Sequence, residues 1–74
     1  MVKVKALGWI AEKIGFNERD IRISKTLRII DFLPVLNTIS DKYLIILVNN
    51  KPANKNTMVK DDDEIVIMPV VSGG

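Results

Sequence analysis

The sequence contains no cysteine and no histidine. Without cysteine, the chain has no disulfide, no thiolate metal site and no cysteine nucleophile. Without histidine, it also lacks the most common general base and the most common zinc ligand of proteins. A chain of 74 residues has room for one small domain, and a hydrophobic content of 47% is enough to form its core. We therefore expect a small folded domain that is poorly equipped to be an enzyme by itself.

Long hydrophobic runs and a large charge excess are also missing. The longest unbroken apolar run, residues 43–48, is much too short to span a bilayer. Residues 2–5 alternate Val and Lys, unlike the apolar block of a signal peptide. The net charge of +2 is too small to imply a nucleic-acid partner. These features predict a cytoplasmic protein with no membrane partner and no direct nucleic-acid partner.

The hydrophobic pattern changes between strand and helix periods along the chain. Alternating or short continuous apolar runs predict strands at residues 1–7, 20–24, 43–48 and 64–68. Helical spacing predicts a short helix at 9–14, capped by Gly15, and a main helix within 26–39, with Thr26 as a candidate cap. Because Pro34 would cost about 3 kcal/mol deep inside a helix, we expect regular helix to start near Ile29. This order predicts an α+β fold with one main helix across a mixed sheet.

Polar residues mark the turns. Asn49 and Asn50 predict a tight turn because Asn accepts a positive φ, and residues 52–57 are expected to be irregular. Residues 61–64 are all acidic, but four consecutive acids cannot all face one ion, so we interpret them as a solvated turn and predict no metal site. Trp9 is interpreted as a partly buried anchor rather than a stacking platform.

The C-terminal segment departs from the rest of the chain. Residues 65–74 carry no charged side chain, although 27% of the chain is charged. Pro69 removes a ladder donor, so we predict a domain at residues 1–69 and a flexible Gly-Gly tail at residues 70–74. Because Gly73 and Gly74 lack a Cβ, a partner's narrow channel can close around their backbone and receive only the carboxylate.

A carboxylate is a poor acyl donor until it is activated. Its conversion to a mixed anhydride with AMP allows a sulfur or amine nucleophile to displace AMP. The sequence has no phosphate-binding loop and no cluster of metal ligands. We therefore expect that this chain binds no cofactor and that another protein supplies the ATP-using machinery.

Four stretches of the sequence carry a family resemblance: residues 2–4 with 12–15, residues 29–33, residues 48–52, and residues 59–65 with Pro69-Val70-Val71-Ser72-Gly73-Gly74. They resemble the ubiquitin-like sulfur carriers, the MoaD and ThiS family, and most of all the MoaD type, the small subunit of molybdopterin synthase. Asn50, Asp62 and Val70 depart from the residues usual in that family, which are Gly, Gly and Pro.

The resemblance implies a ubiquitin-like β-grasp fold and a defined chemistry. It implies that an E1-like adenylyltransferase of the MoeB/ThiF type, using ATP and Mg, adenylates Gly74, which then becomes a thiocarboxylate. The tail would enter the large subunit of molybdopterin synthase (MoaE type) and donate sulfur in molybdenum or tungsten cofactor biosynthesis. Gly73, Ser72 and Val71 would line the partner's channel.

Three other functions are compatible with the same tail. One is that of a ubiquitin-like modifier joined to lysines by an isopeptide bond, as some archaeal members are. Another is that of a sulfur carrier for tRNA thiolation or thiamin thiazole synthesis. The short helix predicted at residues 9–14 argues against the thiazole branch, which usually has a tight turn there. The remaining possibility is an interaction module whose tail has no reaction.

Strand parity predicts a second contact region. Ile65, Ile67, Ile46 and Val48 are expected to face the main helix, and their neighbours are expected to face outward. An apolar patch on an open sheet face suggests a partner surface, for which Met is well suited. The alternative is that loops bury both faces. We call the outward set the docking patch; it consists of Ile45, Leu47, Val66 and Met68.

Overall fold

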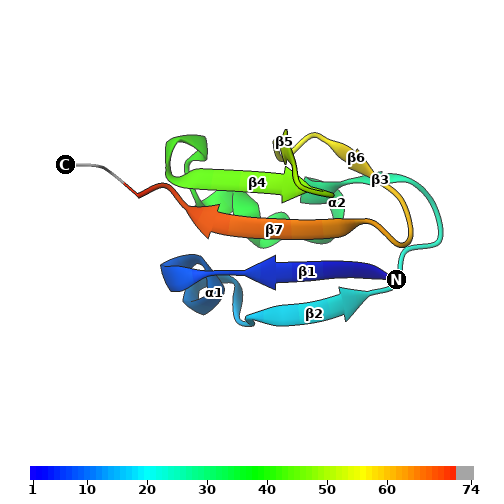
Figure 1. Ribbon diagram of the computed structural model, residues 1–74, viewed down its shortest axis with the longest axis horizontal. Coiled ribbons are helices and arrows are strands. Elements are labelled where there is room, and N and C mark those ends of the chain that lie inside the picture. Colours follow the sequence, from blue (N-terminus) through cyan, green and yellow to red (C-terminus); the bar gives the residue numbers. More distant parts are fainter. Residues whose placement is uncertain (72–74) are drawn as a thin grey trace.

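The computed structural model describes residues 1–71 (Figure 1). A five-stranded mixed sheet has the order β2-β1-β7-β4-β5, and β3 and β6 form a separate two-stranded ladder. The strands are β1 (Val2–Ala6), β2 (Glu18–Ile21), β3 (Leu27–Arg28), β4 (Leu44–Val48), β5 (Lys51–Ala53), β6 (Met58–Val59) and β7 (Glu64–Pro69). The helices are α1 (Gly8–Ile14), α2 (Ile29–Phe32) and two 3₁₀ segments, η1 (Pro34–Thr38) and η2 (Asp41–Tyr43).

The sheet is assembled around β7. This strand pairs in parallel with β1 and antiparallel with β4, so the two predicted strands that bracket the sequence lie side by side in the centre (Figure 1). Alternate residues of a strand point to opposite faces, and the buried residues of β1 and β7 follow that period. Ile65 and Ile67 are fully buried with Ile29 and Leu36 in one apolar core. The predicted α+β class and mixed sheet are confirmed.

The main helix is much shorter than predicted. It begins at Ile29, as expected, but α2 ends at Phe32, and a 3₁₀ helix takes over from Pro34. The ring of a proline disfavours helical backbone at the preceding residue, and Leu33 has φ −129° and ψ 62°. The start is fixed at Arg28, whose backbone N–H donates to the Asp31 carboxylate at 3.1 Å, so the predicted Thr26 cap is wrong.

Two further boundaries differ from the prediction. The second strand spans Glu18–Ile21 instead of residues 20–24, and Ile23 is buried beyond the end of the strand. The segment predicted to be irregular begins with β5, which pairs with β4. Both differences come from pairing with β1 and β4, which the local sequence pattern does not contain.

Residues with positive φ mark the turns. Asn49 and Asn50 have φ values of 51° and 69° and join β4 to β5 as predicted. Asp62 has a φ of 75° in the turn before β7, and Gly15 ends α1 with a φ of 95°. Asn and Asp accept the left-handed region more readily than other residues that carry a Cβ. Asn50 and Asp62 replace the Gly residues usual in the sulfur carriers. Both therefore occupy positions whose backbone conformation Asn and Asp tolerate.

Residues 1–71 include no helix that is both long and apolar enough to cross a membrane.

We expect Asn50→Ala to lower the free energy of unfolding by about 1 kcal/mol, because alanine lacks the local polar contacts that make the left-handed region accessible to Asn. Asn50→Gly should stay within about 0.5 kcal/mol of the unsubstituted protein. Urea unfolding monitored by circular dichroism measures both changes. Lys51→Ala, at an exposed neighbouring position, is the control and should have an effect of less than about 0.5 kcal/mol. Equal stability of the Ala and Gly variants would contradict this interpretation of the turn.

Candidate functional site: the chain exit and the open sheet face

The central strand positions the start of the tail. β7 remains in register with β4 up to the pair Leu44 and Pro69, and the backbone N–H of Val70 then donates to Tyr43 O at 3.0 Å. Val70, which the sequence placed in the tail, is thus still joined to the sheet. Val71 is 85% exposed. The chain therefore leaves the body immediately after Val70.

The opposite side of this exit is formed by the start of α1. The backbone N–H of Leu7 donates to Ile67 O at 3.0 Å, and Gly8 follows with a φ of 57°. A Cβ built on Gly8 would lie 3.1 Å from Pro69 Cγ, closer than ordinary van der Waals contact. Only glycine combines this backbone conformation with this close approach. The end of β7 is therefore held between the start of α1 and Tyr43.

Three of the predicted site residues, Ser72, Gly73 and Gly74, lie outside the described residues. Their predicted roles remain predictions. Val71 belongs to the described part, and its exposure is compatible with its expected place in a partner's channel.

The docking patch lies on one face of two adjacent strands. Ile45 of β4 is opposite Met68 of β7, and Leu47 is opposite Val66. Ile45 is 38% exposed and the other three are half-buried, whereas Ile46, Ile65 and Ile67 face the core. The predicted parity is therefore confirmed. The role of the patch in partner binding stays a prediction.

Charged residues occupy the other half of this sheet face. Lys3 and Lys5 of β1 lie in register with Asp20 and Glu18 of β2. Lys5 also lies in register with Val66 of β7. The face is thus divided into a charged part over β1, β2 and Glu64 at the start of β7, and an apolar part over the rest of β7 and over β4. A partner surface that covers the apolar part would meet its charged border along β1.

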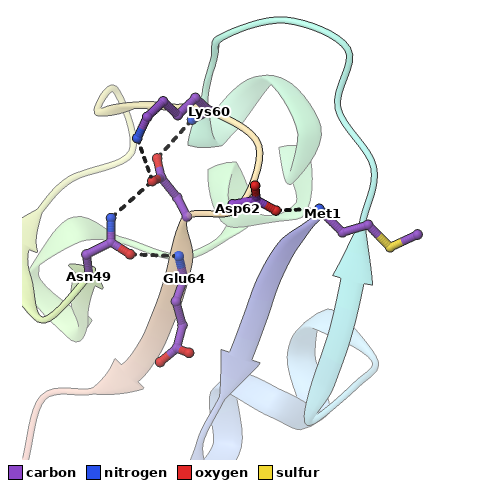
Figure 2. A network of polar contacts seen from close by, with 6 residues as sticks. Met1, Asn49, Lys60, Asp62 and Glu64 are labelled. Atoms are coloured by element: carbon purple, nitrogen blue, oxygen red, sulfur yellow. Dashed lines mark hydrogen bonds and ion pairs between the residues drawn. The ribbon is translucent and has the colours of Figure 1, made fainter.

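A polar network fixes the far end of β7 (Figure 2). Asp63 is only 7% exposed, and its carboxylate accepts hydrogen bonds from the Lys60 backbone N–H at 2.9 Å and from Asn49 Nδ2 at 3.0 Å. Asn49 Oδ1 in turn accepts the backbone N–H of Glu64 at 3.0 Å (Figure 2). The hydrogen bond from the Lys60 backbone holds the pKa of Asp63 below its usual range, although burial opposes this. The interpretation of residues 61–64 as a solvated turn is therefore wrong for Asp63.

Trp9 is also placed differently from the prediction. Trp9 is 45% exposed on the first turn of α1, which is more than expected for the partly buried anchor that the sequence predicts. Sequence reasoning had no signal for this, because exposure at position 9 depends on how α1 packs beside β7.

Other features of the described residues lie apart from the predicted site. A polar groove of about 680 Å³ has none of the predicted site residues in its lining, which includes Arg28, Asn37 and Lys55. Lys55 is engaged within it by the Asp41 carboxylate at 3.0 Å. Within residues 1–71, no three acidic side chains gather closely enough to hold a metal ion.

Residues 4–74 match the model of the ThiS family. The chain belongs to the ThiS family. It has the ubiquitin-like β-grasp fold of the ThiS and MoaD sulfur carriers, as the sequence resemblance implied. Small carriers of this type are in general not enzymes themselves.

Solved structures with this fold include small archaeal modifier proteins and a molybdopterin-converting factor. The small archaeal modifier protein 1 of Haloferax volcanii superposes with a TM-score of 0.71 at 20% identity, covering 99% of this chain and 98% of that one. The protein of the same name from Methanosarcina acetivorans gives 0.64 at 27% identity, with 99% and 95% covered. A chain from the complex of subunits 1 and 2 of the molybdopterin-converting factor of Helicobacter pylori gives 0.61 at 24% identity, with 99% and 97% covered. No curated protein matches the sequence significantly.

We expect Met68→Asp to preserve the fold, because this position is on the open face, and to lower the free energy of unfolding by about 1 kcal/mol at most. Ile67→Asp, one residue earlier on the buried face, is the matched comparison. It should cost more than about 3 kcal/mol, because an unpaired carboxylate enters the core. Thermal unfolding measured for both variants tests the assignment. Global unfolding of Met68→Asp would show that the patch is core.

We expect Asp63→Asn to lower the free energy of unfolding by about 1–3 kcal/mol at neutral pH, since donors aimed at the carboxylate lose their partner. Folding lowers the pKa of Asp63, so its contribution is complete above the ordinary carboxyl pKa and is lost as the pH falls towards the folded value. The difference between the two proteins should therefore shrink below about pH 3.9. Urea titrations at several pH values measure it. Asp20→Asn, on exposed β2, is the control, and a pH-independent difference for Asp63→Asn would contradict the assignment.

Proposed function

We propose that this ThiS-family protein is a sulfur carrier whose Gly74 carboxylate is adenylated, converted to a thiocarboxylate and used in molybdopterin synthesis. The proposal is carried by the chain exit. The buried central strand β7 leads directly into Val71, which is 85% exposed, and the sequence then continues into Ser-Gly-Gly. A rigid base followed by small residues suits a chain end that must enter another protein's active site.

The chain contributes one reacting group to this chemistry. The Gly74 carboxylate attacks the α-phosphorus of ATP and pyrophosphate leaves, which gives an acyl adenylate. Hydrosulfide (HS⁻) then attacks the carbonyl carbon, AMP leaves and the S–H proton is lost to solvent, so that a thiocarboxylate remains on Gly74. An E1-like adenylyltransferase of the MoeB/ThiF type supplies the site for ATP and Mg. This protein serves as substrate and carrier, and we place it in the cytoplasm with these partners.

The large subunit of a molybdopterin synthase (MoaE type) is the second proposed partner. The structural similarity to a chain of the Helicobacter pylori complex of subunits 1 and 2 supports this choice. The presence of α1 between β1 and β2 favours the MoaD type over the thiazole branch. The docking patch supports it as well, because Val66 and Met68 lie on the strand that leads to the exit. A partner that receives the tail can therefore cover the patch in the same contact.

Conjugation to lysines is the second candidate function. It is favoured by the similarity to the small archaeal modifier proteins of Haloferax volcanii and Methanosarcina acetivorans. The adenylate would be the same, but the amine of a lysine side chain would finally attack the carbonyl carbon of Gly74 and form an isopeptide bond. A carrier for tRNA thiolation would form the same thiocarboxylate and differ only in the acceptor.

Intact-mass analysis of the protein isolated from its native host separates these functions. We expect a species in which one oxygen has been exchanged for sulfur at the C-terminus. Branched adducts on other proteins, without this species, would support the modifier instead. A protein that shows neither product, although its adenylyltransferase is present, would contradict both candidates.

Deletion of Gly74 provides the matched loss-of-function test. We expect the deletion to abolish adenylation, because it moves the carboxylate back by one residue, while the circular dichroism spectrum stays unchanged. Met58→Ala, an exposed position on β6, leaves the whole tail intact and is the control that should still be adenylated. Unchanged adenylation after the deletion would contradict the assignment of Gly74 as the reacting residue.

A further inference from the structure

The tether between the body and the reacting carbon is short. Val70 is held by the hydrogen bond of its backbone N–H to Tyr43 O at 3.0 Å. Beyond it, the four residues 71–74 can span about 14 Å at most, since an extended chain covers about 3.3–3.6 Å per residue. An enzyme that reacts with the carbonyl of Gly74 must bring its reacting centre within that distance of Val70. Its surface must therefore meet the residues that surround the exit.

The residues that surround the exit are large, apolar and exposed. We call them the collar: Leu7 and Trp9 beside the start of α1, Tyr43 at the end of η2, and Val70. Between 43% and 49% of the surface of each of these residues is exposed. In Figure 1, α1 and the segment before β4 lie at the same end of the sheet from which the chain leaves. The side chains of a helix tilt towards its N-terminus, which for Trp9 is the end beside Pro69.

The distribution of aromatic residues distinguishes the collar from the rest of the surface. The chain has one Trp, one Tyr and two Phe. Both Phe16 and Phe32 pack against the core, whereas Trp9 in the first turn of α1 and Tyr43 directly before β4 are exposed. Trp and Tyr are the residue types most enriched where a few contacts dominate a protein interface. Each combines a large apolar surface with one polar group that needs a partner.

We propose that the collar binds the rim of the channel in the E1-like adenylyltransferase and determines how tightly that enzyme holds this protein. The inference rests on the proposed function and adds a contact region distinct from the docking patch. The rim that fits is apolar and offers hydrogen-bond acceptors to the indole N–H and the phenol O–H. We assign the collar to the adenylyltransferase because both candidate functions require the same acyl adenylate. The channel of this enzyme must therefore accept the tail whether the carbonyl is later transferred to sulfur or to a lysine amine.

The test uses the full-length protein and the adenylyltransferase of the same genome, assayed by ATP–pyrophosphate exchange. Trp9→Ala and Tyr43→Ala should each raise KM for the carrier about tenfold, as expected for an interface residue of this kind. The kcat should stay unchanged, because the reacting group is on Gly74. The matched control is Met58→Ala, since Met58 is 55% exposed but lies on β6 at the other end of the molecule (Figure 1). Its KM should not change.

A second measurement needs no substitution. Trp9 is the single tryptophan of the chain, so incorporation of 5-fluorotryptophan gives one ¹⁹F signal from the collar. Addition of the adenylyltransferase should shift and broaden this signal. An unchanged signal at a concentration that supports adenylation would overturn the inference.

The outcomes separate this inference from the proposed function. If the unsubstituted protein is adenylated and the Gly74 deletion is not, an unchanged KM for both aromatic variants overturns the collar and leaves the proposed function intact. An equal rise of KM for Met58→Ala also overturns the collar, because the effect would not be local. If the unsubstituted protein supports no exchange, the proposed function fails and the collar fails with it.

Discussion

The position of β7 between β1 and β4 is the constraint on which the other features depend. The strand is paired on both sides, and the fully buried Ile65 and Ile67 hold one of its faces against the core. Burial of an isoleucine side chain contributes about 1.5–3 kcal/mol, so a shift of this strand by one residue would be costly. Because β7 cannot shift, Met68 is kept on the open face and the chain exit is kept at one defined place.

Polar contacts fix the two ends of this strand in different ways. At its start, Asp63 and Asn49 connect the turn before β7 to the turn after β4. At its end, the Val70 N–H reaches Tyr43 O, and Gly8 allows α1 to approach Pro69. The first end is closed by a buried carboxylate that has its hydrogen bonds satisfied, whereas the second is lined by exposed apolar side chains. The end of the domain at the start of β7 therefore contributes to stability, whereas the end at the chain exit presents a surface for contact with a partner.

The parts of this arrangement that follow from local pattern could be predicted from the sequence. The alternation in β1 and β7, the Gly15 cap and the Asn49–Asn50 turn depend on neighbouring residues only, and each was predicted correctly. The length of the main helix was not, because the helical spacing of apolar residues continues to Leu36 although Pro34 disfavours helical backbone at Leu33. The burial of Asp63 and the exposure of Trp9 depend on contacts between distant segments. No local pattern contains them.

The parallel pairing of β1 with β7 also has a consequence for biosynthesis. β7 follows both of its partners along the chain, and without it the β1–β2 pair and the β4–β5 hairpin share no ladder. Contacts between segments so far apart form slowly, because a long loop must close first. The last-made strand therefore joins both halves, and the exit is built only when the sheet is complete. In an unfinished or misfolded nascent chain, the C-terminal tail is therefore not held at the position from which downstream enzymes would bind it.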